Sequence, residues 1–381
     1  LSGFIQSPFL FKSASIISDI YVRFLKLVSL PLIFLSVTST LSQIKGYCEI
    51  KYLGIRVMGY TLITTLVASF IGLLLFIAFN PSIPSPALKA PQLEMTQGTY
   101  QNFLLNIIPA NFVEAFLNNN VIGVMIIAFF LGFATLHLPQ QKKEFLSQLF
   151  SCLFDVVIQV TAFILKLIPL AIWAFVTEFV ANHMNGIALN SLGLYFSLVL
   201  GANLLQALVI LPLLLKMKGL SPLRIAKGYF PALSLAFLTK SSTATLPTTI
   251  RCAQQNLKLS PKVSNFTLAL CVTCNMNACA AFILMTTLFV SSSNGIHFSG
   301  PELLGWTLLA TLAAIGNAGI PMGCYFLTTA FLSALNVPLH IMGLILPLYT
   351  ILDMVETATN VWSDGVIAAI VGKDLKQDIT S

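Results

Sequence analysis

The chain has 381 residues, of which 57% are hydrophobic and only 9% are charged, with a formal net charge of +7. A soluble domain carries about 25% charged residues. This chain has too few charges to cover a water-exposed surface, so its composition predicts a polytopic membrane protein. The excess of positive charge could indicate a nucleic-acid partner. However, the basic residues lie in the connections between apolar runs, which argues against a nucleic-acid-binding patch.

Apolar runs long enough to cross a bilayer recur along the whole chain. A transmembrane helix needs about 20 consecutive, mostly apolar residues. A shorter apolar stretch at 103–118 is expected to be partly interfacial. We expect spanning helices over residues 22–44, 55–79, 120–137, 148–177, 189–215, 262–291 and 340–372.

The basic residues predict the orientation of these helices. Alternate connections are rich in Lys and Arg, whereas NHMNGIALN and SSSNGIHFSGPE contain neither. Because cytoplasmic loops carry the excess of Lys and Arg, we expect a cytoplasmic C-terminus. The residues behind this prediction are Lys45, Lys51, Arg56, Lys142, Lys143, Lys216, Lys218, Arg224, Lys227, Arg251, Lys258, Lys262, Lys373 and Lys376.

Two further segments do not resemble plain spanning helices. Residues 222–250 contain KSSTATLPTT, and residues 301–336 contain AAIGNAGIPMG. Each segment is apolar at its ends and small, polar or Gly/Pro-rich in the middle, as in a re-entrant hairpin. Non-helical backbone at membrane depth is tolerated only inside protein or along a cavity. Two such interruptions indicate a binding site built from helix ends, as in secondary transporters.

The last apolar run carries five polar residues on one helical face. They are Asp353, Glu356, Thr357, Asn360 and Asp364, at offsets of 3, 4, 7 and 11 from the first, a helical repeat. Ionisable groups in the membrane are costly and mark a solute or ion site by default. A structural polar network between helices would explain one acid, but it explains three acids on one stripe poorly.

Two other polar clusters point to the same chemistry. Lys240, Ser241, Ser242 and Thr243 lie at the tip of the first hairpin, where hydroxyls and free backbone N–H groups suit a carboxylate. Thr273, Asn275 and Asn277 interrupt an apolar run. Their oxygens could coordinate a hard cation such as sodium, or they could form ordinary hydrogen bonds between helices.

Four of these stretches together resemble a known family. TKSSTATLPTT, CNMNACAA, AAIGNAGIPMG and DMVETATNVWSD are similar, in order and spacing, to signatures of the dicarboxylate/amino acid:cation symporters, the glutamate transporter homologues. The resemblance implies an all-α membrane protein with two re-entrant helical hairpins, a homotrimeric assembly and an elevator mechanism. SASIISDIYVRFLKLVSLPLIF resembles the family's second helix, so the first is expected to be absent.

The resemblance also implies a division of the chain into two bodies. A scaffold would hold the trimer, and a transport core would move across the membrane. The scaffold would comprise residues 1–54 and 81–187. The core would comprise the helix at 55–80 and residues 188–381, with the spans at 262–291 and 340–372 and both hairpins.

By matching positions, the resemblance assigns roles to individual residues. Asp353 would hold the substrate ammonium group, and Asn360 and the backbone around Ser242 would hold its α-carboxylate. Thr357 and Cys279 would line the pocket, and Ile320 and Cys324 would close the gate. One sodium ion would bind Asn275, Asn360, Asp364 and the carbonyl of Cys271, and a second would bind carbonyls near Thr273, Ala314 and Asn317.

Three departures from the family pattern bear on the substrate and the ions. Glu356 stands where acidic-substrate members have an Arg, and a carboxylate repels a second carboxylate in a low-dielectric pocket. The stretch DMVETATN is instead similar to serine/threonine:sodium symporters. Asn277 replaces the acid of the third sodium site. Ile283 replaces the Glu linked to proton and potassium coupling in mammalian members.

We therefore expect a sodium-driven symporter for small neutral amino acids such as serine, threonine or alanine. Lys240 leaves alternatives open. It could pair with Glu356 or Asp353, or it could serve as the counter-charge for glutamate, aspartate or a C4-dicarboxylate. A cationic amino acid recognised by Glu356 is a third alternative.

Other classes of protein fit less well. An intramembrane enzyme would need a nucleophile–base pair or a set of metal ligands, whereas the four histidines lie near predicted span ends and do not cluster. A passive channel would not need occluding hairpins. The odd number of cysteines, seven, indicates no disulfide framework. We expect buried free thiols, including the CxxC pair Cys271 and Cys274, and no organic cofactor.

Overall fold

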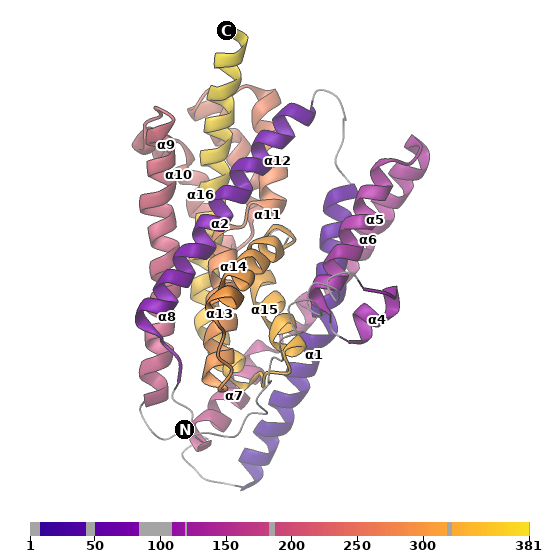
Figure 1. The fold of residues 1–381 in the computed structure, drawn as a ribbon, viewed down its shortest axis with the longest axis vertical. Coiled ribbons are helices and arrows are strands. Elements are labelled where there is room, and N and C mark those ends of the chain that lie inside the picture. The colour runs from indigo at the N-terminus through magenta and orange to yellow at the C-terminus, as the bar shows by residue number, and fades with distance from the viewer. Residues whose placement is uncertain are drawn as a thin grey trace.

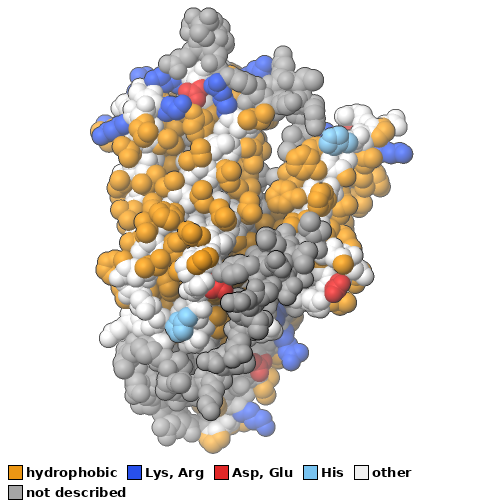
Figure 2. Space-filling model, viewed as in Figure 1, with side chains coloured by type: hydrophobic (Ala, Val, Ile, Leu, Met, Phe, Trp, Pro, Cys, Tyr) orange, Lys and Arg blue, Asp and Glu red, His pale blue; other side chains and the backbone are white. Residues whose placement is uncertain are grey.

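The protein is described by a computed structural model over residues 8–42, 50–83, 109–118, 120–182, 187–317 and 322–380. Within these ranges all regular structure is helical (Figure 1). Hydrophobic side chains cover the middle of the face in Figure 2, and Lys and Arg gather toward its ends. Six described helical stretches are long and apolar enough to cross a membrane: Pro8–Ser42, Leu53–Phe79, Gln140–Leu165, Leu189–Met217, Pro261–Ser293 and His340–Leu375.

The first helix group surrounds α1 (Pro8–Ser42), which packs against α5 (Val121–Leu136), α6 (Gln140–Leu165) and α7 (Ile168–Asn182). The prediction of one helix over 148–177 is wrong, because α6 ends at Leu165 and α7 begins at Ile168. Pro169 lies in the first turn of α7, where its missing N–H costs no hydrogen bond. The predicted interfacial stretch contains the short α4 (Phe112–Leu117), and residues 103–108 lie outside the described ranges.

The second helix group begins with α2 (Ile50–Phe79), which packs against α13 (Asn277–Ser293), α14 (Gly300–Ile315) and α8 (Ile187–Leu205). α8 continues through a π-helical turn, η2 (Gln206–Ile210), into α9 (Leu211–Met217). These three elements together make the predicted span at 189–215. The π turn places Pro212 in the first turn of α9, where a proline is tolerated.

Both predicted interruptions are present as helix–turn–helix units. α10 (Pro222–Thr239) and α11 (Ser242–Arg251) pack against each other, and a second π turn, η3 (Cys252–Asn256), follows α11. α14 (Gly300–Ile315) and α15 (Gly323–Ala334) are the two helices of the second unit, and residues 318–321 between them lie outside the described ranges. In Figure 1 the first unit descends from the end that carries the C-terminus, whereas the second lies in the other half of the molecule.

The central element of the fold is α13 (Asn277–Ser293), which contacts α2, α14, α15 and α16 (His340–Thr380). The predicted span at 262–291 is present as the stretch Pro261–Ser293, but it consists of two helices, because α12 (Pro261–Cys274) ends before Asn275 and α13 begins at Asn277. Every side chain from Asn277 to Ser291 is buried. The break between α12 and α13 therefore lies inside protein, where freed backbone groups can be satisfied.

Candidate functional site

The polar stripe of the last helix is enclosed by neighbouring helices. All five of its side chains are buried, with exposed fractions from 1% for Glu356 to 6% for Asp353 and Thr357. α16 packs against α10, α11, α12 and α13. Hydrogen bonds from Asn275 to Asp364 and from the Ala278 N–H to Asn360 place the stripe beside the chain break at Asn275–Met276.

Hydrogen bonds hold the break between α12 and α13 to α16. Asn275 Nδ2 donates to Asp364 Oδ1 at 2.8 Å, and the backbone N–H of Ala278 donates to Asn360 Oδ1 at 2.9 Å. The first N–H groups of a helix have no partner within it. Asn360 therefore satisfies one such group at the start of α13.

One buried oxygen at this break lacks a hydrogen-bond donor. It is Asn275 Oδ1, which has no partner among the described residues. Asp364 is 3% exposed, and its described side-chain hydrogen bond comes from Asn275 alone. Isolating an ionised carboxylate from water costs several kcal/mol unless a counter-charge compensates it. The donor set of amide and carboxylate oxygens fits a hard cation such as sodium.

The side-chain amide of Asn277 connects this break to α2 and to α16 through hydrogen bonds. Asn277 Nδ2 donates to Ser363 Oγ on α16, and Thr65 Oγ1 donates to Asn277 Oδ1 at 2.8 Å. The side chain therefore uses both ends of its amide between helices. Thr65 and Ser363 were not predicted as site residues, because a single hydroxyl in an apolar helix carries no distinctive pattern.

The Glu356 carboxylate is only partly satisfied. Tyr349 OH donates to Glu356 Oε2 at 3.3 Å, whereas Glu356 Oε1 is buried and has no hydrogen-bond partner. Tyr349 was missed by the sequence prediction. It lies four residues before Asp353, so extending the stripe backwards by one helical step would have found it.

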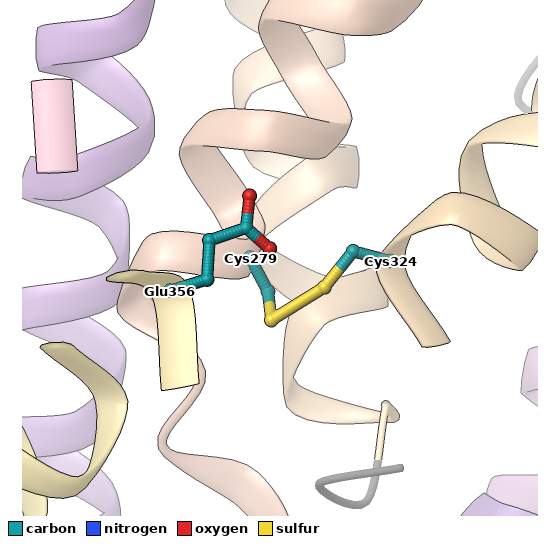
Figure 3. Close-up of side chains that lie close together, drawn as sticks. All are labelled: Cys279, Cys324 and Glu356. Atoms are coloured by element: carbon teal, nitrogen blue, oxygen red, sulfur yellow. A yellow bond between two sulfur atoms is a disulfide. The ribbon is translucent and has the colours of Figure 1, made fainter. Parts of the chain in front are cut away.

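Cys279 and Cys324 lie beside this carboxylate and form a disulfide (Figure 3). The prediction of free thiols is therefore wrong for these two residues. Their Cα atoms are 5.6 Å apart, within the usual range for a disulfide. Among the other described cysteines, Cys252, Cys271 and Cys274 are buried free thiols, as expected, and Cys152 is exposed and free.

The tip of the first helix–turn–helix unit is formed by Lys240 and Ser241, between α10 and α11. Lys240 adopts a left-handed backbone conformation, with φ of 53°. Ser241 caps α11 by accepting a hydrogen bond from the Ala244 N–H at 3.2 Å. α11, which begins directly after this tip, packs against α16. In the described part of the chain no ion pair joins Lys240 to Glu356.

Comparison with known proteins bears directly on this arrangement. Residues 1–374 match the model of the sodium:dicarboxylate symporter family. The chain belongs to this family. It is therefore a multi-pass membrane transporter of a sodium-symporting family, and not an enzyme.

Two relatives show how wide this family is. The excitatory amino acid transporter 3 of Mus musculus is 25% identical over 423 residues, covering 95% of this chain and 80% of the relative. The L-cystine uptake protein TcyP of Bacillus licheniformis is 27% identical over 382 residues, covering 94% of this chain and 82% of the relative. The predicted resemblance is confirmed, and these relatives bear the names of transporters for different solutes.

The residues that the family resemblance assigned to the gate and to the second sodium site are the last to be placed. Asn317 Nδ2 donates to the sulfurs of Cys279 and Cys324 at 3.4 and 3.3 Å, whereas its Oδ1 is buried without a partner. The carbonyl of Ala314 accepts the Asn317 N–H at 3.0 Å. Thr273 Oγ1 donates within its own helix to the Leu270 carbonyl. Ile320 lies outside the described residues.

Proposed function

We propose that this family member is a sodium-coupled symporter that takes up small neutral amino acids such as serine, threonine or alanine. The observation that carries the proposal is the pair of buried carboxylates at Asp353 and Glu356, one turn apart on α16. One carboxylate can neutralise a substrate ammonium group. The second disfavours a substrate with its own side-chain carboxylate, because like charges repel strongly in a low-dielectric pocket.

The proposed substrate site combines three elements. Asp353 holds the ammonium group, and Thr357 and Cys279 line the pocket. Asn360 and the backbone N–H groups around Ser242 hold the α-carboxylate, since the start of α11 offers free donors and the positive end of a helix dipole. Ser241 and Thr243 flank these donors at the same helix end.

The proposed sodium sites are built from amide, carboxylate and backbone carbonyl oxygens. Asn275, Asn360, Asp364 and the carbonyl of Cys271 would hold one ion. The unpartnered Asn275 Oδ1 and the buried Asp364 support this assignment. Carbonyls near Thr273, Ala314 and Asn317 would hold a second ion, supported by the unpartnered Asn317 Oδ1. Sodium is cargo here, and its gradient would drive uptake.

We place the moving boundary between the two helix groups. Residues 1–54 and 81–187 would form the scaffold, and residues 55–80 and 188–381 the transport core. The core is tied together near its C-terminal end, where Asp374 on α16 accepts a hydrogen bond from Tyr60 on α2 at 2.8 Å and pairs with Lys218 at 3.3 Å. The two helix–turn–helix units would be re-entrant hairpins that close over the substrate while the core moves like an elevator.

We also propose a homotrimer in a bacterial inner membrane, with a cytoplasmic C-terminus. The trimer would assemble through the scaffold. On α6, apolar side chains at Leu149, Val156 and Phe163 recur every seven residues and are 41%, 59% and 63% exposed, a face that either lipid or a like helix can cover.

Three other classes of substrate are alternatives. Because no ion pair between described residues joins Lys240 to Glu356, Lys240 could serve as the counter-charge for glutamate, aspartate or a C4-dicarboxylate. The TcyP relatives suggest cystine, whose two ammonium groups could meet Asp353 and Glu356. A cationic amino acid held by Glu356 would meet the same pair of acids.

A binding screen separates these substrates. The purified protein is heated with each amino acid in turn, and with cystine and succinate, with and without sodium. A ligand that binds the folded state raises its apparent stability, by about 2.7 kcal/mol at a hundred times the dissociation constant. We expect serine, threonine or alanine to stabilise the protein only with sodium. Stabilisation by aspartate or cystine and not by serine would overturn the proposed specificity.

A further inference from the structure

Three side chains from three helices converge in the pocket. Cys279 lies near the start of α13, Cys324 lies near the start of α15, and Glu356 lies in the middle of α16. The two sulfurs and a carboxylate oxygen lie within 4.8 Å of one another (Figure 3). Among the described residues, this is the one group of three His, Cys, Asp or Glu side chains close enough to share a metal ion.

The carboxylate of this cluster lacks a partner on one oxygen. Glu356 is 1% exposed, and its Oε1 has no hydrogen-bond partner. Among the described residues, its other oxygen accepts a long hydrogen bond from Tyr349. Asp353 lies one helical turn before Glu356 on α16, so two acidic side chains share this buried face. A buried anion with a free oxygen favours a cation beside it.

The sulfurs are supported by hydrogen-bond donors. Asn317 Nδ2 points to both sulfurs, and Asn360 Nδ2 donates to Cys279 Sγ at 3.4 Å. In metal sites such outer donors orient the ligands and tune them. In the structure the two sulfurs are joined as a disulfide. A dithiol or phosphine reductant supplies two electrons and solvent supplies two protons to convert it to two thiols at the same place, and metal binding releases these protons.

We propose that the reduced Cys279–Cys324 pair and Glu356 form a binding site for a soft divalent cation such as Zn²⁺. Two thiolates and one carboxylate are established zinc ligands, and three protein ligands leave the fourth position open. Zn–S bonds of about 2.3 Å place two sulfurs on one ion about 3.8 Å apart in tetrahedral geometry. A Cα–Cα separation of 5.6 Å allows this with side-chain rotation.

The cation would act as a clamp. Cys324 lies on α15 of the second helix–turn–helix unit, whereas Cys279 lies on α13 and Glu356 lies on α16. An ion bound to all three would hold α15 against α13 and α16 and would fill the pocket assigned to the amino acid. The clamping effect on transport rests on the proposed function, whereas the binding of the cation does not.

The test is a titration of the purified full chain with Cd²⁺, a soft divalent probe with an ultraviolet thiolate-to-metal absorption band. A Cys152→Ser background removes the exposed thiol. The protein is reduced with a phosphine and kept free of sodium and amino acids. We expect saturable binding of one Cd²⁺ per chain with the thiolate band. Cys279→Ser and Cys324→Ser should each weaken binding roughly a hundredfold, and Glu356→Gln roughly tenfold.

Two controls keep the proposal open to refutation. The double variant Cys271→Ser/Cys274→Ser removes the other close cysteine pair and should bind Cd²⁺ as tightly as the background protein. The background protein oxidised to the disulfide should not bind, a comparison that needs no further mutation and no refolding. Reduced protein without stoichiometric binding, or binding that follows Cys271 and Cys274, would overturn the site.

A parallel measurement separates this proposal from the proposed function. Serine binding is followed by thermal stabilisation in the same reduced preparation without Cd²⁺, and then with it. We expect Cd²⁺ to suppress the serine response. Cd²⁺ binding without any serine response would keep the metal site and refute the substrate. A serine response unaffected by bound Cd²⁺ would show that the cation lies outside the pocket, and would also overturn the proposal.

Discussion

Asp364→Asn is the substitution that tests the proposed sodium site most sharply. The amide has the shape of the carboxylate and keeps an oxygen that can accept the hydrogen bond from Asn275, which is 2.8 Å long in the structure. What the variant loses is one unit of negative charge in a site that is 3% exposed. The substitution therefore separates the charge from the packing.

The size of the effect follows from that charge. A contact to a charged group contributes about 1.5–3 kcal/mol net, which corresponds to roughly a ten- to hundredfold change in affinity. The sodium concentration for half-maximal uptake at saturating serine should rise by about this factor. Selectivity among amino acids should change little, because Asp364 lies two turns beyond Glu356 on α16.

Thermal unfolding gives a second readout. If Asp364 binds sodium, its substitution should not lower the stability of the sodium-free protein, whereas loss of a purely structural residue should lower it. A buried carboxylate without its cation is costly, so the sodium-free variant should be at least as stable as the sodium-free wild type. Sodium should then stabilise the wild type and not the variant. Asp374→Asn, a carboxylate on the same helix that pairs with Lys218, is the matched control and should leave the sodium titration unchanged. A lower sodium-free stability with an unchanged sodium titration would refute the ion role of Asp364.

Three further predictions address the substrate and the motion. Asp353→Ala should weaken serine binding roughly ten- to hundredfold by removing the partner of the ammonium group; near-normal binding measured by calorimetry would contradict this role. Glu356→Arg, alone or with Lys240→Ser, should shift competition in uptake assays toward aspartate, because a guanidinium matches a carboxylate bidentately. If neither variant gains affinity for aspartate, Glu356 does not face the substrate side chain. A Cβ at Gly343 would lie 2.1 Å from the Phe175 ring on α7, and such overpacking costs about 1–3 kcal/mol. If α7 of the scaffold and α16 of the transport core slide past each other during transport, Gly343→Ala should lower the maximal uptake rate and leave the affinity for serine unchanged. A variant with lower thermal stability and an unchanged uptake rate would instead place α7 and α16 in one rigid body.

Much of the architecture follows from patterns in the chain itself. The lengths of the apolar runs predicted the long helices, and the run at 120–137 corresponds to α5 within one residue at each end. The Ser/Thr-rich and Gly/Pro-rich centres predicted the breaks after α10 and α14. The helical repeat of Asp353, Glu356 and Asn360 predicted a shared buried face, because a single helix converts spacing directly into direction.

Other features depend on contacts between distant segments. The helix break at Asn275 lies within an apolar run, so the sequence pattern does not reveal it. Hydrogen bonds from the Asn275 side chain and the Ala278 N–H to α16 stabilise the break. The pairing of Cys279 with Cys324 joins residues 45 positions apart on different helices. No local pattern connects two such cysteines, and an odd number of cysteines argued against disulfides. Only the packing of α13 against α15 brings them together.

The most direct test of the central claim is concentrative uptake by the purified protein in liposomes. An inward sodium gradient should accumulate radiolabelled serine above its external concentration, and a sodium ionophore should release it. Aspartate and cystine in excess should compete poorly with serine. Serine that only equilibrates across the membrane, or accumulates equally when potassium replaces sodium, would contradict sodium-coupled symport of a small neutral amino acid.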